Sequence, residues 1–326
     1  MINVGILSFA HLHAHSYASC LQSMPNASLT AIYDDDAKRG RAAVRDYGGK
    51  YFADLEKFLA QDLQAVIICS ENVNHRPHAV AAAEAKKPIL CEKPIATTLA
   101  DARAMIQAAQ RNRVSLSVAY PCRYAPPIIE TKKQIQSGAL GQLLAMTTTN
   151  NGQNPGGWFT DPKLSGGGAT VDHTVHMADL LRWMTGTEFS KVYCTQATVI
   201  DRSLKTDDLG ILHIEMQGGL KIAHTASWNR PAAFPTWGDI TMDIAGTKGS
   251  LYVDAFNEKI DVYSNKASRA QWAPYGTNID LALLSDFISA IENDVPASIT
   301  AEDGLQTLKL TLAAQKSAKQ RQFVRV

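Results

Sequence analysis

The chain has 326 residues, of which 45% are hydrophobic and 19% are charged, and its formal net charge is +1. This length allows two domains with separate cores, and the balanced charge argues against the basic surface that nucleic acid or an anionic membrane requires. The five cysteines form no CxxC pair and leave one over, which favours reduced thiols. The sequence has neither an apolar run of about 20 residues nor a cleavable leader pattern, so we expect a cytoplasmic protein. The nearly neutral net charge favours a small-molecule partner.

Residues 2–120 alternate apolar runs with helical patterns, as a doubly wound parallel sheet requires. The predicted strands are residues 2–9, 29–34, 65–70, 88–91 and 115–120. The predicted helices are residues 13–24, 36–47, 75–86 and 98–112. This is the layout of a Rossmann dinucleotide-binding domain, to which we assign residues 1–121.

The turn after the first strand lacks the glycines of a dinucleotide fingerprint. A G-x-G-x-x-G motif would occupy residues 8–13, where the chain has Ser8-Phe9-Ala10-His11-Leu12-His13. The small Ala10 still permits close approach of a pyrophosphate, and the helix that follows still offers N–H groups and a partial positive charge. We therefore predict a cofactor loop in which the Ser8 hydroxyl or the His13 imidazole replaces backbone contacts.

Polar residues follow the next strands. Asp34 ends the second strand, where an acidic side chain binds the adenosine ribose and disfavours the 2′-phosphate of NADP; the alternative is a helix N-cap, for which Asp35 and Asp36 compete. Asn72 and His75 follow the strand at residues 65–70, and the alternative for His75 is a surface position.

Glu92-Lys93-Pro94 follows the short apolar run at residues 88–91. In open α/β sheets, ligands bind beyond the carboxyl ends of the strands, and Pro94 keeps Lys93 out of the helical region. We predict that Lys93 reaches the ligand crevice. The alternative is a strand that ends in a charged turn.

From residue 122 the pattern changes, and we assign residues 122–326 to a second domain. Helices are predicted at residues 125–137, 169–185, 279–293 and 303–320. Strands are predicted at residues 143–150, 191–200, 207–217, 221–229, 237–245, 250–254 and 259–264. Together they predict an α+β domain on a large, mostly antiparallel open sheet.

Two stretches of this domain carry candidate chemistry. The loop at residues 151–162 contains amides and Trp158, which suit sugar hydroxyls and a pyranose face, although amide-rich loops are also common as turns. Asp172, His176 and Asp179 share one face of the helix at residues 169–185. A carboxylate beside an imidazole suits a general base, and the alternative is a solvated helix face.

These stretches resemble the Gfo/Idh/MocA family of nicotinamide-dependent sugar and polyol oxidoreductases over nearly the whole chain. The resemblance rests on Glu92-Lys93-Pro94, on Arg123-Tyr124, and on Gly166-Gly-Gly followed by Asp172, His176 and Asp179. It implies a nicotinamide cofactor, for which the charge of Asp34 and Asp35 favours NAD over NADP, and a homodimer or homotetramer formed through the C-terminal sheet. The chain departs from the family pattern at the glycine loop.

The resemblance implies catalysis by Lys93, Asp172 and His176. His176 would take a proton from a substrate hydroxyl, Lys93 would stabilise the alkoxide, and Asp172 would orient the pair. The expected cofactor contacts are Ser8, Phe9, Ala10, His11, His13, Asp34, Ser70, Asn72, His75, Glu92, Lys93 and Arg123. The expected substrate contacts are Lys93, Asn151, Trp158, Asp172, His173 and His176. No metal ligand is assigned.

Two alternatives remain at this point. A metal-dependent hydrolase would use His11 and His13 with other histidines, but the antiparallel strands after residue 190 do not fit a (β/α)₈ barrel. The second alternative is a family member without catalytic activity that senses a nucleotide or sugar, as the missing glycines would allow.

Overall fold

The computed structural model describes residues 1–326, apart from the side chain of Arg269. The chain forms two compact units, Met1–Pro121 with Asp280–Leu308, and Cys122–Ile279 with Lys309–Val326. The sequence prediction placed everything after residue 121 in one domain. Contacts group Asp280–Leu308 with the first unit instead, because Ser117 Oγ donates to the Ile299 carbonyl at 2.6 Å and the Tyr120 hydroxyl lies 2.6 Å from Thr307 Oγ1.

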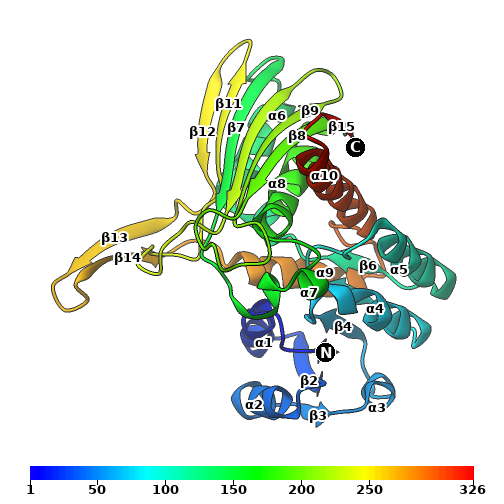
Figure 1. Ribbon diagram of the computed structural model, residues 1–326. Coiled ribbons are helices and arrows are strands. Elements are labelled where there is room, and N and C mark those ends of the chain that lie inside the picture. Colours follow the sequence, from blue (N-terminus) through cyan, green and yellow to red (C-terminus); the bar gives the residue numbers. More distant parts are fainter. The chain divides into compact units, whose positions relative to one another are not determined.

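The first unit contains a parallel sheet with the strand order β3-β2-β1-β4-β5-β6, which confirms the predicted doubly wound fold (Figure 1). Its strands are β1 (Ile2–Leu7), β2 (Ala27–Tyr33), β3 (Lys50–Phe52), β4 (Ala65–Ile68), β5 (Ile89–Cys91) and β6 (Leu116–Val118). The order reverses between β1 and β4. The carboxyl ends of these strands therefore form the edge at which such a sheet binds ligands.

The helices of this unit begin largely where the sequence predicts. They are α1 (His13–Ser23), α2 (Ala37–Tyr47), α3 (Leu55–Leu59), the 3-10 turn η1 (Asn72–Asn74), α4 (His75–Glu84), α5 (Leu99–Asn112) and α9 (Ile279–Glu292). The N-cap of α2 is Asp36, which accepts two backbone N–H groups, and the N-cap of α5 is Thr98. Gly5 of β1 leaves room for the Phe58 ring of α3, because a Cβ at position 5 would lie 2.6 Å from that ring.

The second unit is built on a sheet with the order β12-β11-β7-β10-β9-β8-β15 (Figure 1). Its strands are β7 (Leu143–Asn151), β8 (Phe189–Ala197), β9 (Leu209–Met216), β10 (Lys221–Ser227), β11 (Thr241–Gly246), β12 (Ser250–Asp254) and β15 (Val324–Arg325). The β7–β10 pair is parallel and the other neighbours are antiparallel, so the sheet is mostly antiparallel, as predicted. A separate hairpin joins β13 (Lys259–Ser264) to β14 (Arg269–Pro274).

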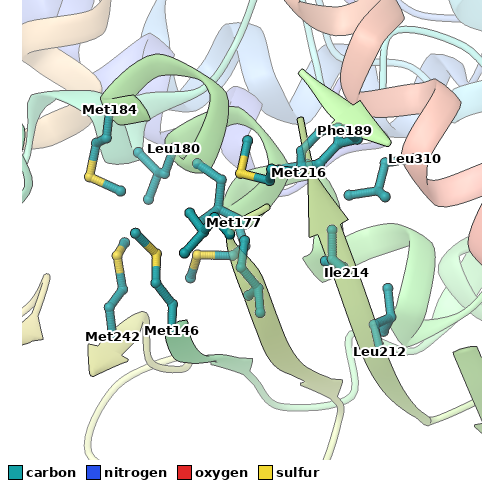
Figure 2. Close-up of a cluster of buried hydrophobic side chains, with 14 of the residues drawn as sticks. Met146, Met177, Leu180, Met184, Phe189, Leu212, Ile214, Met216, Met242 and Leu310 are labelled. Atoms are coloured by element: carbon teal, nitrogen blue, oxygen red, sulfur yellow. The ribbon is translucent and has the colours of Figure 1, made fainter. Parts of the chain in front are cut away.

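Helix α8 (Ala169–Thr185) packs on β7, β9 and β10. The other helical segments after residue 120 are the 3-10 turns η2 (Pro121–Tyr124) and η3 (Gly157–Thr160), and the helices α6 (Pro126–Gln136), α7 (Pro162–Ser165) and α10 (Ala301–Gln320). Figure 2 shows methionines of α8, β7, β9 and β11 pointing toward one another in the core, together with leucines and Ile214 (Figure 2). This apolar contact fixes one side of α8 against the sheet.

Among the helices that the structure describes, none is both long enough and apolar enough to cross a membrane.

Candidate active site

The loop after β1 has no glycine, but one of its residues adopts a backbone conformation that is typical of glycine. Ser8 has a φ of 75°, in the left-handed region that glycine normally occupies. The Ser8 hydroxyl accepts the Ala10 N–H at 3.1 Å, which helps to hold this conformation. The N-cap residue of α1 is Leu12, whose side chain makes no hydrogen bond to the helix N–H groups. The first turn of α1, all of which the structure describes, carries no acidic residue. The residues present therefore fit the pyrophosphate of a dinucleotide.

Asp34 holds this loop from the end of β2. Its fully buried carboxylate accepts the Phe9 N–H at 2.8 Å and the Asp36 N–H at 2.9 Å, and the Arg39 guanidinium donates to both of its oxygens. Burial raises the pKa of Asp34, although the hydrogen bonds from Arg39 and the backbone oppose this effect. The N-cap alternative falls to Asp36. The ribose contact of Asp34 stays a prediction, and Arg39 is a neighbour that the sequence analysis missed.

His75 is buried, and both nitrogens of its ring contact main-chain carbonyl groups. Its Nδ1 lies 3.0 Å from the Pro94 carbonyl and its Nε2 lies 3.1 Å from the Ser70 carbonyl. The ring thus links the end of β4 to the turn after β5, and the surface alternative for His75 is wrong because the side chain is fully buried. Ser70 is held from its other side, because its hydroxyl lies 2.9 Å from His78 Nδ1.

Glu92 is the centre of a polar network at the end of β5. Its buried carboxylate accepts the Tyr17 hydroxyl at 2.5 Å and the Lys93 N–H at 3.1 Å, and lies 3.1 Å from His13 Nδ1. Burial alone would raise the pKa of Glu92, but the imidazoles of His11 and His13, with hydrogen bonds from His13 and Tyr17, hold it well below its usual range. Glu92 therefore fixes the backbone of Lys93 as an ionised carboxylate.

The pKa of His13 also depends on the Glu92 carboxylate. Burial lowers its pKa, but the charge of Glu92 and the hydrogen bond between the two side chains outweigh burial, so the pKa of His13 is raised above 6.5. Tyr17 lies four residues after His13 on α1, and this spacing places both side chains on one helical face. That spacing was the available signal for Tyr17, which the sequence analysis missed.

His11, His13 and Glu92 offer ligand atoms within 4.8 Å of one another, which is close enough for a metal ion. Two contacts disfavour that use. The His13 N–H donates to His11 Nδ1 at 3.2 Å, so in the neutral ring the proton is on Nε2, the atom that faces Glu92. The Glu92 oxygens already accept hydrogen bonds. The expectation that no metal is required stays a prediction.

The second unit places a polar pair on α8. Asp172 and His176 are half-buried and lie one helical turn apart, whereas most of the helix is buried. Asp172 Oδ2 accepts the indole N–H of Trp228 at 3.1 Å, and His176 Nδ1 lies 4.0 Å from the Cys122 sulfur. This side of α8 can thus present a carboxylate and an imidazole together, as proton transfer requires. No local pattern indicates Trp228, which lies 56 residues from Asp172.

Three other residues of this unit for which the sequence predicts ligand contacts make contacts within the protein. Arg123 is buried and donates to both oxygens of Asp179, at 2.7 and 2.5 Å, so Asp179 is an ion-pair partner rather than part of a solvated face. The Asn151 side-chain oxygen accepts the Ser227 hydroxyl at 2.7 Å. Trp158 stacks on Phe159 with ring centroids 3.9 Å apart. The proposed ligand contacts of Arg123, Asn151 and Trp158 stay predictions.

Comparison with known proteins agrees with this geometry. Residues 2–120 match a family model described as "Oxidoreductase family, NAD-binding Rossmann fold", and residues 128–252 match the "GFO/IDH/MocA C-terminal domain". A relative, myo-inositol 2-dehydrogenase of Thermotoga maritima, is 25% identical over 99% of this chain and 97% of its own length.

Solved structures show the same fold over the whole chain. GenD2 from gentamicin A biosynthesis, in complex with NAD, has a TM-score of 0.92 at 22% identity and covers 100% of this chain and 96% of its own. A levoglucosan dehydrogenase in complex with NADH and L-sorbose has a TM-score of 0.86 at 25% identity and covers 100% and 98%, respectively.

Proposed function

Because the chain belongs to the Gfo/Idh/MocA family of oxidoreductases, with an NAD-binding Rossmann fold in its first unit, we propose that it transfers hydride between NAD and a hydroxyl-bearing carbon of a sugar, inositol or related polyol. The observation that carries the proposal is the pair of Asp172 and His176 on the half-buried side of α8. A sheet-edge loop for the dinucleotide and a polar pair for the proton are the two parts that such a reaction needs. The names of the relatives support the substrate class.

In this proposal each side chain has one role. His176 takes the proton from the substrate hydroxyl, which contributes roughly 10²–10⁴ to the rate. Lys93 stabilises the developing alkoxide, a charge contact for which removal costs about 3–4 kcal/mol. Asp172 orients the imidazole and the substrate. Bound NAD supplies the hydride acceptor at its nicotinamide ring.

The test is a screen for absorbance change at the nicotinamide band with NAD, sugars and inositols. Lys93→Met should lower kcat by about 10²-fold or more while NAD affinity and thermal stability remain near wild type. Lys57→Met, at an exposed lysine of α3, is the matched control and should behave as wild type. Near wild-type kcat in Lys93→Met would contradict the catalytic role of Lys93.

We further propose a homodimer or homotetramer formed through the outer face of the large sheet, and a cytoplasmic location. The face includes small exposed residues, Ala145, Thr147 and Ala223, beside an Ile211 that is 52% exposed, and such a surface suits flat packing against a second copy. Light scattering on purified protein tests the oligomer. The free, buried cysteines support a reducing compartment.

A further inference from the structure

His173 connects the polar pair of α8 to the main chain of β7. The His173 side chain is 5% exposed. Its Nδ1 lies 2.8 Å from the Asn150 carbonyl oxygen, and its Nε2 lies 3.3 Å from Asp172 Oδ2. Gly152 leaves space for the ring edge, because a Cβ there would lie 2.5 Å from His173 Cε1. Both ring nitrogens are therefore directed at protein oxygens, so the expected substrate contact of His173 would require one of them to exchange its partner.

The contact between Asp172 and His173 is not a consequence of helix geometry. Consecutive residues of an α-helix point in directions about 100° apart and do not normally face each other. Here the hydrogen bond to Asn150 turns the imidazole so that its second nitrogen meets the neighbouring carboxylate. The strand, rather than the helix, thus determines the direction of the ring.

The two contacts also determine where protons lie. A carbonyl oxygen only accepts, so His173 Nδ1 carries a proton. In the neutral ring, Nε2 then has a lone pair, which a carboxylate oxygen would repel. The 3.3 Å contact between Nε2 and Asp172 Oδ2 is attractive when a proton lies between these two atoms. The pair then has no net charge, and Trp228 and His173 both contact the same carboxylate oxygen, Asp172 Oδ2.

We propose that His173 is a positioning residue that fixes the orientation of the Asp172 carboxylate by tying it to the β7 backbone. The proposal rests on the proposed function for its effect on turnover, but its proton arrangement is independent of that function. Two other ionisable groups lie nearby. Burial lowers the pKa of His224 on β10 to about 4, so this ring is neutral at assay pH, and the Asp239 carboxylate accepts a hydrogen bond from the Arg230 guanidinium.

Two amide substitutions separate the two contacts. His173→Asn places its amide N–H near the position of Nδ1, which keeps the bond to Asn150 and removes the donor to Asp172. His173→Gln places its amide N–H near the position of Nε2, which keeps the donor to Asp172 and loses the bond to Asn150. The side chains have the same chemistry, so the comparison is matched.

The measurements are kcat, KM and melting temperature for both variants, alone and combined with Asp172→Asn. We expect kcat of both variants to fall about 10-fold or more, because each variant keeps only one of the two contacts that tie Asp172 to β7. In the Asp172→Asn background, neither His173 substitution should lower kcat further, because the group through which His173 acts has changed. Wild-type kcat in either variant, or a loss that follows melting temperature alone, would overturn the proposal.

A second measurement needs no turnover. In ¹⁵N-histidine NMR spectra of the full-length protein, assigned with His173→Asn, Nδ1 of His173 should be protonated and the Nε2 signal should shift in Asp172→Asn. An unprotonated Nδ1, or an Nε2 signal insensitive to Asp172→Asn, would overturn the proposal. A wild type that shows these signals but oxidises no sugar or polyol would count against the proposed function and leave the His173 arrangement supported.

Discussion

His13 should make the stability of the first unit depend on pH. Its raised pKa comes from Glu92, which stays ionised because its own pKa is low, while the pKa of Tyr17 is raised well above 10. Of His13, Glu92 and Tyr17, His13 is the one whose pKa is raised from an ordinary value close to neutrality. Because its folded-state pKa exceeds the unfolded value of 6.5, the added stability is fully present below pH 6.5 and is lost as the pH rises through the folded-state pKa.

The substitution His13→Gln isolates the charge, because glutamine can still donate a neutral hydrogen bond to Glu92. A hydrogen bond to a charged group is worth about 1.5–3 kcal/mol and a neutral one about 0.5–1.5 kcal/mol. The His13 side chain is 26% exposed, so we take the difference as about 1 kcal/mol. That corresponds to a melting temperature roughly 2–4 °C below wild type at pH 6.

The assay is thermal unfolding of both proteins between pH 5.5 and 9, with NAD affinity by calorimetry at the same values. The difference in melting temperature should shrink as the pH rises. His15→Gln is the matched control, because His15 lies on the same helix and lies 3.1 Å from the Tyr47 hydroxyl at the surface. A difference for His13→Gln that is constant over this pH range would refute the charge argument.

Two further predictions concern the cofactor and metal. Asp34→Ser should narrow the preference for NAD over NADP. It should also destabilise the protein by about 1.5–3 kcal/mol, because Phe9 and Arg39 lose a charged acceptor. Titration with both cofactors and thermal unfolding measure these two effects, and a wild type that binds NADP more tightly than NAD would refute the ribose role of Asp34. Treatment with EDTA should leave activity unchanged, and activity lost to the chelator and restored by zinc would instead support a site at His11, His13 and Glu92.

The sequence predicted the elements that carry strong periodicity and missed the short ones. The helix and strand patterns of the first unit were placed within a few residues, but β3 and α3, with 3 and 5 residues, are too short to show a period. β15 is a pair of residues that is held by pairing with β8, which the local sequence does not indicate. Pairing between strands also made one neighbour pair of the second sheet parallel, which alternation alone does not reveal.

The sequence indicates candidate residues but not the residues that they contact. The short motifs identified Asp34, Glu92 and Asp172, because these residues follow strands or share a helix face. Their hydrogen bonds join residues far apart in sequence, as between Glu92 and Tyr17 or between Asp172 and Trp228. The start of α8 is held in the same way, because Asp207 accepts the N–H groups of Gly168 and Thr170. A single sequence without its fold contains no distance information for such pairs.

The loop after β1 shows how side chains replace what glycine normally supplies. A residue other than glycine in the left-handed region costs on the order of 1–3 kcal/mol, and Ser8 occupies that region. The Ala10 N–H bound by the Ser8 hydroxyl, and the Phe9 N–H bound by Asp34, each offset part of that cost. Because the Asp34 carboxylate is itself held by Arg39, the conformation of the loop depends on a charge pair that a glycine fingerprint would not need. Asp34 is therefore required for the shape of the loop, whether or not it also contacts the ribose.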